Sequence, residues 1–383
     1  MNWKAKPLGS CIEVFDSCRR PVTKKDRVLG PYPYYGASGI VDYVDSYIFE
    51  GLHVLVAEDG ENLRSRKLPI AYLADGRFWV NNHAHVLRAN DENDTRFLSY
   101  MIESLDLSGF ITGSTQPKLS QAALLSIPLR LPKLAEQRRI AEVLGALDDK
   151  IESNQAVVTR AEQLIDAIAE QKATVLPTVA LSEVCSLSKS TWKPDTSSDQ
   201  TVHLFSLPAF DEGAVPEQAA VSTIKSNKTL VDRPGILVSR LNPRISRMWW
   251  VETDATPVSV CSPEFAYLTA GDMHGLACTW LAVRSPEFRG EIVDRVTGTS
   301  GSHQRVRPAD LMTIGVPDYR SLAEHTQMTV LTLLHLVSAR RQQSVALAEL
   351  RDALLPELMS GRMRVDEAGR LVSEALDEEV ADV

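Results

Sequence analysis

The sequence lacks the short motifs that mark many enzyme active sites. Its 383 residues contain no G-x-x-x-x-G-K-S/T phosphate loop, no G-x-G-x-x-G turn, no G-x-S-x-G nucleophile elbow and no H-E-x-x-H zinc motif. These absences argue against the enzyme classes that rely on those motifs. We therefore expect a binding protein.

Cysteine is scarce, and the apolar runs are short. The five cysteines are odd in number, widely spaced and free of any C-x-x-C, which argues against a disulfide framework and a zinc site. No apolar stretch reaches 18 residues, and the N-terminus has no apolar run of signal-peptide length. We expect a cytoplasmic protein with no membrane partner. Its length allows two to three domains, each with a hydrophobic core.

Two short patterns resemble fragments of catalytic or metal sites. Asp148 and Lys150 have the D-x-K spacing of some nucleases, but they fall inside a helical pattern with no Pro-Asp turn before them. His83 and His85 alternate as on one face of a strand, yet no third ligand accompanies them. We interpret the first pattern as part of a helix and the second as a packed or surface pair.

The acidic residues are unevenly distributed. The net charge is −9, yet residues 1–133 carry 16 Lys and Arg against 15 Asp and Glu, whereas residues 365–383 carry 1 against 7. We expect residues 363–383 to form an acidic, mobile tail. The near-neutral globular part can present a basic face, although the overall charge does not favour nucleic acid as a partner.

One long helix is predicted from Leu134 to Gln171. Its apolar residues recur at alternating steps of four and three, interrupted only by Asn154, which is a heptad pattern. At about 1.5 Å per residue this helix is roughly 57 Å long, far longer than a small core requires. The predicted seam consists of Ile140, Leu144, Leu147, Ile151, Asn154, Val158, Ala161, Ile165 and Ile168.

A second helix near the C-terminus repeats this spacing. Arg340 and Gln343 interrupt its seam near the middle, as Asn154 interrupts the first. We predict an antiparallel coiled coil in which these polar residues meet and fix the register. The alternative is two separate amphipathic helices, one on each domain. The predicted second seam consists of Leu333, Leu336, Leu347, Leu350 and Leu354.

The chain contains two similar halves. Residues 124–127 (LLSI) correspond to 311–314 (LMTI), residues 134–136 to 322–324 (both LAE), and residues 53–56 to 235–238. Each half reads as a globule of short strands and helices followed by a long helix. We predict an α+β fold in which two similar domains are separated by two long antiparallel helices with approximate twofold symmetry. The predicted divisions are 1–133, 134–175, 176–320, 321–362 and 363–383.

Polar loops recur at equivalent points of the two halves. Glutamine can pair with adenine, arginine and lysine with guanine or phosphate, and hydroxyl groups with phosphate oxygens. Each loop alone is typical of a solvated surface, but their recurrence favours a DNA-binding role. The candidates in the first half are Arg64, Arg66, Lys67, Ser114, Thr115, Gln116 and Lys118. Those in the second are Arg240, Asn242, Arg244, Arg247, Ser302, His303, Gln304, Arg305 and Arg307.

Two segments carry a resemblance to a known family. Residues 113–152, GSTQPKLSQAALLSIPLRLPKLAEQRRIAEVLGALDDKIE, and residues 347–365, LAELRDALLPELMSGRMRV, closely resemble the specificity subunit of Type I restriction-modification systems. The resemblance implies that 1–133 and 176–320 are target-recognition domains, each reading one half of a split DNA target. It also implies that the helices act as a spacer, long enough for on the order of 17 base pairs.

The same resemblance implies that this chain performs no chemistry and holds no cofactor. Two methyltransferase subunits would bind S-adenosylmethionine and methylate adenine N6, and two motor-nuclease subunits would use ATP and Mg²⁺. The only Asn-Pro in the sequence, Asn242-Pro243, is followed by Arg244 rather than by the Pro-aromatic pair of an adenine methyltransferase. The helices 134–171 and 321–360 would dock the partner subunits.

Two other functions are compatible with the sequence. One is the recognition subunit of a two-subunit restriction enzyme that cleaves DNA beside its own bipartite site. The other is a coiled-coil interaction protein without a nucleic-acid role.

The two halves differ where the resemblance places partner docking. Residues 136–140 read EQRRI whereas residues 324–328 read EHTQM.

Overall fold

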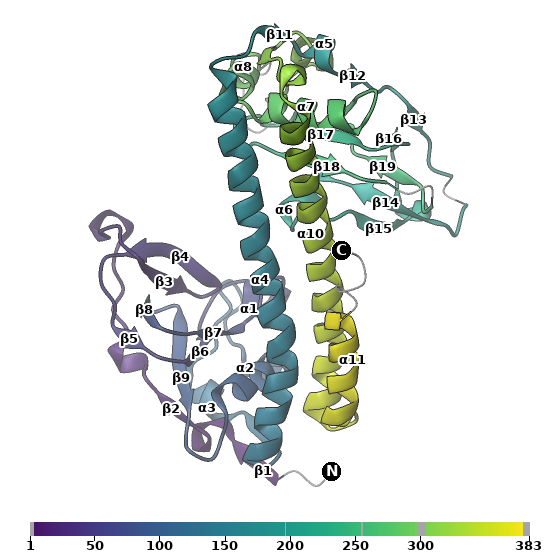
Figure 1. Ribbon diagram of the computed structural model, residues 1–383. Coiled ribbons are helices and arrows are strands. Elements are labelled where there is room, and N and C mark those ends of the chain that lie inside the picture. Colours follow the sequence, from purple (N-terminus) through teal and green to yellow (C-terminus); the bar gives the residue numbers. More distant parts are fainter. Residues whose placement is uncertain (1–3, 196, 254–255, 297–303, 378–383) are drawn as a thin grey trace. The chain divides into compact units, whose positions relative to one another are not determined.

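The computed structural model describes residues 4–195, 197–253, 256–296 and 304–377 (Figure 1). The chain folds into two compact units, which we call unit 1 (Met1–Asp149 with Leu347–Val383) and unit 2 (Lys150–Ala346). Each unit contains one globular α+β domain and part of two long helices. We call the domain of unit 1 the first domain and that of unit 2 the second domain. These helices are α4 (Leu134–Ala173) and α10 (Glu324–Ser360). The predicted fold class is confirmed.

The first domain contains two four-stranded sheets and a short outer strand pair. The outer pair is β1 (Lys4–Pro7) with β10 (Pro128–Leu131). An antiparallel sheet has the order β2 (Ile12–Val14), β9 (Ala84–Ala89), β6 (His53–Ala57) and β7 (Ala71–Ala74). The other has the order β4 (Gly39–Val44), β3 (Tyr32–Gly36), β8 (Arg77–Val80) and β5 (Phe49–Glu50). The helices are α1 (Asn62–Ser65), α2 (Thr95–Ser104) and α3 (Gln121–Ser126).

The second domain is built in the same way. Its outer pair is β11 (Thr178–Ala180) with β21 (Gly315–Pro317). One sheet has the order β12 (Ser186–Leu187), β20 (Phe265–Thr269), β17 (Gly235–Ser239) and β18 (Met248–Val251). The other has the order β13 (Thr191–Trp192), β16 (Lys228–Val231), β19 (Ser259–Cys261), β14 (Thr201–Phe205) and β15 (Glu217–Ala220). The helices are α5 (Leu181–Val184), α6 (Leu207–Asp211), α7 (Met273–Arg284), α8 (Pro286–Asp294) and α9 (Pro308–Leu311).

The two domains share one topology. Strands β3 to β9 correspond in chain order to β14 to β20, with the same neighbours in the sheets. In both domains one strand pair is parallel, β3 with β8 and β14 with β19, whereas the other strand pairs among the described residues are antiparallel. Helices α2 and α3 correspond to α7 and α9. Among the described elements, the second domain adds β13, α6 and α8. The predicted duplication is therefore confirmed at the level of topology.

Matched backbone contacts locate the equivalent residues. The N–H of Leu8 donates to the carbonyl of Ile127 at 2.8 Å, and the N–H of Leu181 donates to the carbonyl of Ile314 at 2.9 Å. Leu124 and its predicted counterpart Leu311 are both fully buried. The predicted match between residues 124–127 and 311–314 is thus confirmed.

The predicted match between residues 134–136 and 322–324 differs from the structure by two residues. Helix α4 begins at Leu134 and α10 at Glu324. The Gln137 side chain donates to the carbonyl of Pro132 at 3.0 Å, and the Gln327 side chain donates to that of Leu322 at 2.9 Å. Because these amides tie equivalent helix starts to the preceding loops, Gln137 corresponds to Gln327. The shared L-A-E begins α4, whereas in the second copy only its last residue, Glu324, lies in α10.

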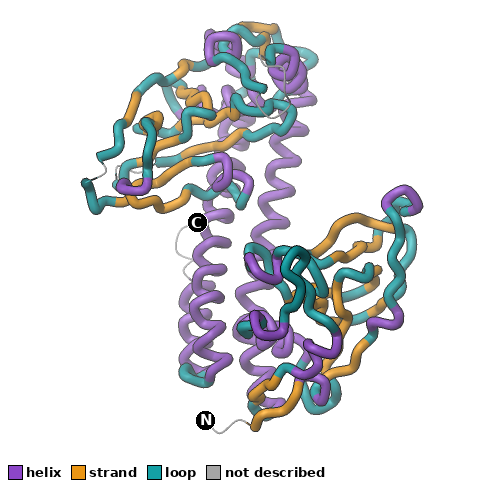
Figure 2. Tube along the Cα trace, turned by 180° about the vertical axis from the view of Figure 1, so that it is seen from behind, coloured by secondary structure: helices purple, strands orange, loops and turns teal. Residues whose placement is uncertain are grey.

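The long helices pair antiparallel within each unit, as Figures 1 and 2 show. In unit 2 the buried Asn154 side chain donates to Gln343 Oε1 at 2.8 Å and to Ser344 Oγ at 3.3 Å. Val337 of α10 packs on Val158 and Ala161 of α4. The polar residues predicted to meet do meet, and a buried hydrogen bond of this kind fixes the register of two helices.

The apolar seam of α10 is out of phase with the predicted one in its first half. Val330, Leu334 and Val337 are buried, whereas Leu333 and Leu336 are half-buried. Residues 330–337 contain apolar side chains in two neighbouring phases, and the predicted Leu333 and Leu336 each lie one residue before the buried Leu334 and Val337. Val330, Leu334 and Val337 correspond to Ile140, Leu144 and Leu147. Of the other predicted seam residues, the buried ones are Ile140, Leu144, Leu147, Asn154, Val158, Ala161, Ile165, Leu347 and Leu354. The half-buried ones are Ile151, Ile168 and Leu350.

The acidic segment predicted to be a mobile tail is instead a helix over most of its length. Helix α11 (Val365–Asp377) buries Val365, Ala368 and Val372, which share one face at helical spacing. Asp366 in its first turn forms an ion pair with Arg139 of α4. The prediction was wrong because it relied on the acidic composition of the segment and did not consider the helical spacing of these three apolar residues.

No helix in the described ranges combines the length and the apolarity needed to cross a membrane.

Neighbouring residues of α4 allow a matched test of the packing. Ile165 is 1% exposed in the core of unit 2, whereas Leu164 is 49% exposed. We expect Ile165→Ala to lower the free energy of unfolding by about 2–5 kcal/mol, because it leaves a cavity. Leu164→Ala should change it by no more than about 0.5 kcal/mol. Urea unfolding of both variants is the measurement, and equal losses would contradict this packing.

Candidate nucleic-acid interface

The two sets of candidate residues in the first domain lie together. One set follows β6, and the other precedes α3. The N–H of Gly60 donates to the carbonyl of Pro117 at 3.1 Å, and the N–H of Leu119 donates to that of Glu58 at 2.8 Å. Asp59 and Lys118 form an antiparallel bridge between them. We call residues 58–67 with 112–118 the first loop pair.

The second domain joins the equivalent loops by the same bonds. The N–H of Asn242 donates to the carbonyl of Gln304 at 2.8 Å, and the N–H of Val306 donates to that of Arg240 at 3.0 Å. Leu241 and Arg305 form the bridge. Residues 240–247 with 304–307 are the second loop pair. By these contacts, Lys118 corresponds to Arg305 and Glu58 to Arg240.

Both loop pairs turn at a residue with positive φ. Gly60 has a φ of +110° and Asn242, at the equivalent position, has a φ of +50°. Glycine adopts such angles without a steric penalty, and asparagine tolerates them better than most residues. The backbone conformation of the turn is therefore sufficient to explain why glycine and asparagine occur at this position. A DNA contact by the Asn242 side chain is not required to explain it.

Arg64 and Arg66 hold the first loop pair to the domain. Arg64 donates to the carbonyls of Gly113 at 2.5 Å and Ser114 at 3.0 Å. Arg66 donates to the carbonyls of Glu103 at 2.5 Å and Leu105 at 2.7 Å, at the end of α2. Both guanidinium groups thus contact backbone, which places them as supports for the loops.

The outer residues of the first loop pair are available to a ligand. Lys67, Ser114, Thr115, Gln116 and Lys118 are all exposed. Within the described ranges, no hydrogen bond or ion pair engages the side chains of Lys67, Thr115 or Gln116. An exposed amide, a hydroxyl and cations together fit the donors and acceptors that read base edges and phosphates.

The cations of the second loop pair divide in the same way. Arg247 forms a two-point ion pair with Asp211 at 2.6 and 2.8 Å, and Arg240 donates to the carbonyl of Pro263 at 2.5 Å. Arg244 and Arg307 are exposed.

The remaining candidates of this loop pair are Gln304, Ser302 and His303. Gln304 is half-exposed and supplies the carbonyl that joins the loops. Ser302 and His303 lie outside the residues that the structure describes.

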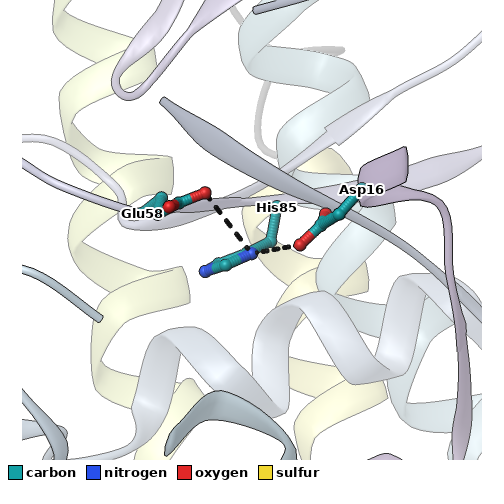
Figure 3. Close-up of side chains that lie close together, drawn as sticks. All are labelled: Asp16, Glu58 and His85. Atoms are coloured by element: carbon teal, nitrogen blue, oxygen red, sulfur yellow. Dashed lines mark hydrogen bonds and ion pairs between the residues drawn. The ribbon is translucent and has the colours of Figure 1, made fainter. Parts of the chain in front are cut away.

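A polar network beneath the first loop pair was not found from the sequence (Figure 3). Asp16, Glu58 and His85 come from three separate segments, and their ligand-type atoms lie within 4.8 Å of one another. Arg19 donates to Glu58 Oε2 at 2.6 Å and to the carbonyl of Ala84 at 2.8 Å. No local pattern unites these residues, so only the fold could bring them together. Of these three residues, only His85 is a candidate from the sequence, as one of the alternating pair with His83.

The chemistry of this network does not fit a metal centre. His85 Nδ1 lies 2.6 Å from Asp16 Oδ2, and its Nε2 lies 2.8 Å from the carbonyl oxygen of Leu119. Both ring nitrogens thus already lie at hydrogen-bond distance from protein oxygens. Arg19 also faces both carboxylates, at 2.6 Å from Glu58 and 3.5 Å from Asp16. The cluster is an ion network that supports the loop carrying Leu119.

The two carboxylates of the network stay ionised. Burial alone would raise the pKa of Asp16, but the hydrogen bond and charge of His85 and the N–H of Val86 lower it below its ordinary value. Burial likewise opposes the bonds from Arg19 and Lys118 at Glu58, and the pKa of Glu58 is again lowered. The negative charges are thus stabilised by the cations around them.

Comparisons with known proteins agree with the resemblance seen in the sequence. Residues 1–163 match the family model described as the Type I restriction modification DNA specificity domain. A Haemophilus influenzae protein assigned as a type I restriction enzyme specificity subunit is 38% identical over 148 residues, or 38% of this chain and 37% of that protein. The Escherichia coli type I restriction enzyme EcoprrI specificity subunit is 27% identical over 120 residues, or 30% of this chain and 28% of that protein. The aligned regions thus span between 28% and 37% of these relatives.

A solved structure extends the likeness of the fold. The S subunit of a Type-I restriction-modification system from M. genitalium matches with a TM-score of 0.59 and 16% identity, over 93% of this chain and 96% of that one. At this identity the likeness concerns the fold. The predicted resemblance is confirmed, because residues 1–163 match the model of the specificity-domain family and nearly the whole chain has the fold of such a subunit.

The ion network makes the first domain sensitive to acid. Because the pKa of Asp16 is lowered on folding, its stabilising effect is present above the ordinary value of 3.8 and is lost as pH falls through the lower, folded-state value. We expect Asp16→Asn to cost about 1–3 kcal/mol at neutral pH and to flatten the pH dependence of unfolding below this value.

Urea unfolding between neutral pH and acid is the measurement. Asp91→Asn, which changes an exposed carboxylate of the same domain, is the control. An Asp16→Asn variant with the pH dependence of the unaltered protein would show that this carboxylate does not stabilise the fold.

Proposed function

We propose that this chain is the DNA specificity subunit of a Type I restriction-modification complex. In this role each globular domain reads one half of a bipartite target. The observation that carries the proposal is that one loop junction, with a cation at its centre, is built twice in two domains of the same topology. The specificity-domain match of residues 1–163 supports a DNA-reading role for the first copy.

The role of the second domain rests on repetition. The family match ends at residue 163, before this domain begins. The second loop pair nonetheless joins the same two segments by the same backbone bonds as the first. A surface that reads DNA in one copy has its counterpart in the other, with different side chains. Different side chains at equivalent points give each domain its own base preference.

Recognition by these loops combines two kinds of contact. Exposed lysine and arginine side chains attract the phosphate backbone and position the duplex. Amide and guanidinium groups such as those of Gln116 and Arg305 offer paired donors and acceptors to base edges in the major groove. The supports, including Arg64 and Arg66, fix the loops from which these groups extend.

The long helices serve as the spacer. Helix α4 has 40 residues. At about 1.5 Å per residue this corresponds to roughly 60 Å, or on the order of 17 base pairs. The buried contact of Asn154 with Gln343 prevents one helix from sliding along the other, so the spacing is set by helix length.

The chemistry belongs to the partners. Two methyltransferase subunits dock on the outer faces of α4 and α10 and bring S-adenosylmethionine to an adenine flipped from the duplex. Two motor-nuclease subunits bring ATP and Mg²⁺. The chain itself recognises DNA and arranges these enzymes, and it works in the cytoplasm where the target DNA lies.

Footprinting tests this function directly. The chain is purified with its methyltransferase subunits, and the complex is incubated with a duplex chosen by methylation mapping in the source cell. Two protected patches with an accessible middle are expected. One continuous patch, or no protection, would argue for a function other than reading a bipartite site.

Helix length gives a second prediction. Inserting one heptad at matching positions of α4 and α10 adds about 10 Å to the spacer. We expect the unspecified gap in the methylated target to lengthen by about three base pairs, with both half-sites unchanged. Methylation mapping of cells carrying the variant is the measurement. An unchanged gap would reject the helices as a ruler.

The first loop pair gives a third prediction. Gln116→Ala and Lys118→Ala should each weaken reading of the same half-site by about 1–3 kcal/mol, and leave the other half unaffected. Binding to duplexes altered in one half at a time is the measurement. Lys6→Ala, at an exposed lysine on β1, is the control. Equal weakening at both half-sites would indicate loss of folding rather than loss of a contact.

A further inference from the structure

Each loop pair holds its central cation against a carboxylate. In the first, Lys118 Nζ lies 3.2 Å from Glu58 Oε1. In the second, Arg305 Nε and Nη2 lie 2.9 and 2.8 Å from the two oxygens of Glu264. The side chains of Lys118 and Arg305 are 53% and 43% exposed, whereas those of Glu58 and Glu264 are 14% and 28% exposed. The cations therefore face solvent, and the carboxylates lie beneath them.

The carboxylates come from different positions of the shared fold. The N–H of Glu58 donates to the carbonyl of His83 at 2.9 Å, and the N–H of Arg240 donates to that of Glu264 at 2.8 Å. Glu58 is thus equivalent to Arg240, and Glu264 is equivalent to His83. A carboxylate meets the cation in both copies, although the residues at each position differ in charge. The arrangement recurs even where the sequence does not.

Each carboxylate also has a second cation beside it. Arg19 donates to Glu58 at 2.6 Å. The charge of Arg240 acts on Glu264, in addition to the bond from Arg305. Because Arg19 also lies 3.5 Å from Asp16, its charge is already balanced inside the network of the first junction. A duplex approaching either loop pair still meets exposed cations, Lys67 in the first and Arg244 in the second.

We propose that Glu58 and Glu264 are positioning residues, each of which fixes the cation that its domain places against DNA. This inference rests on the proposed function and names the pairs that act in each half-site, Glu58 with Lys118 and Glu264 with Arg305. Lysine and arginine side chains lose rotamer freedom when they bind, and a cation already held in place loses less. A fixed cation can contact only one base edge or phosphate, whereas a mobile cation can contact many different ones.

The carboxylate acts in the opposite direction on non-specific affinity, which depends on charge alone. Its negative charge weakens attraction to the phosphate backbone, which dominates binding to unrelated DNA. Removing the charge should therefore lower base preference and leave non-specific affinity unchanged or tighter. General damage to the domain would lower both. This separation distinguishes a positioning role from a purely structural one.

The experiment uses the complex of the full chain with its methyltransferase subunits and a library of randomised DNA duplexes. Bound duplexes are sequenced to give the base preference of each half-site, and affinity is then measured on one enriched and one scrambled duplex. The variants are Glu58→Gln, Lys118→Gln, Glu264→Gln and Arg305→Gln. The double variant Glu58→Gln with Lys118→Gln completes a cycle for the first loop pair.

We expect Glu58→Gln and Lys118→Gln to reduce the preference in one half-site by about tenfold, and Glu264→Gln and Arg305→Gln to do so in the other. Binding of the Glu58→Gln and Glu264→Gln variants to the scrambled duplex should be unchanged or tighter. The double variant should lose no more preference than Lys118→Gln alone. Full additivity would mean that Glu58 acts through Arg19 instead, and would overturn its positioning role.

Two other outcomes decide the matter. If the unaltered complex selects a two-part target and both Glu→Gln variants keep its preferences, the positioning role is wrong and the proposed function stands. If the unaltered complex selects no two-part target, the proposed function fails and the positioning role fails with it. Arg64→Ala, which removes a loop support without touching either pair, is the comparison for loss of preference by loosened loops.

Discussion

The pairing of two long helices through one apolar seam is the constraint on which the rest of the structure depends. In unit 2 the helices do more than pack on each other, because Ile165 of α4 and Leu334 of α10 belong to the same hydrophobic core as strands β17 and β20. The second domain therefore cannot rotate about its helices without exposing that core. In unit 1, Tyr100 of α2 bonds to Asp148 of α4, and Gln137 of α4 bonds to the backbone of Asp94. Each domain is thus fixed to the helices that carry it.

Repetition of the fold explains how one chain holds two related surfaces, which under the proposed function differ in specificity. The backbone bonds that join the loop pairs are the same in both domains, so the place of each surface is set by topology. The side chains differ, even to the reversal of charge between Glu58 and Arg240. Backbone geometry therefore places each surface, and under the proposed function its side chains decide which bases it recognises. This division accounts for two similar domains with little similarity in their loops.

The sequence was sufficient for features that depend on periodicity or on position along the chain. The heptad pattern and Asn154 predicted the paired helices and their polar contact, and matched loops predicted which residues lie together. The phase of the second seam was missed because residues 330–337 are apolar in two neighbouring phases, and only the structure shows that Leu334 and Val337 are the buried ones. Helix α11 was missed because its acidic residues obscured three buried apolar ones.

The chemistry inside the candidate site was the least predictable part. Glu58 and Glu264 are separated from their cations by 60 and 41 residues. Arg64 and Arg66 were predicted only as DNA contacts, and the structure adds bonds from their guanidinium groups to backbone carbonyls. Contacts of this kind are set by tertiary structure, and no local pattern contains them.

The central claim is that two copies of one loop junction read two separate stretches of a single DNA duplex. Photo-crosslinking tests it most directly, with a photoreactive amino acid placed at Gln116 in one preparation and at Gln304 in another. The crosslinked nucleotides are then mapped within the target of the methyltransferase complex. Two clusters separated by an unlinked gap are the predicted result. Overlapping clusters, or crosslinks from one position only, would contradict the account.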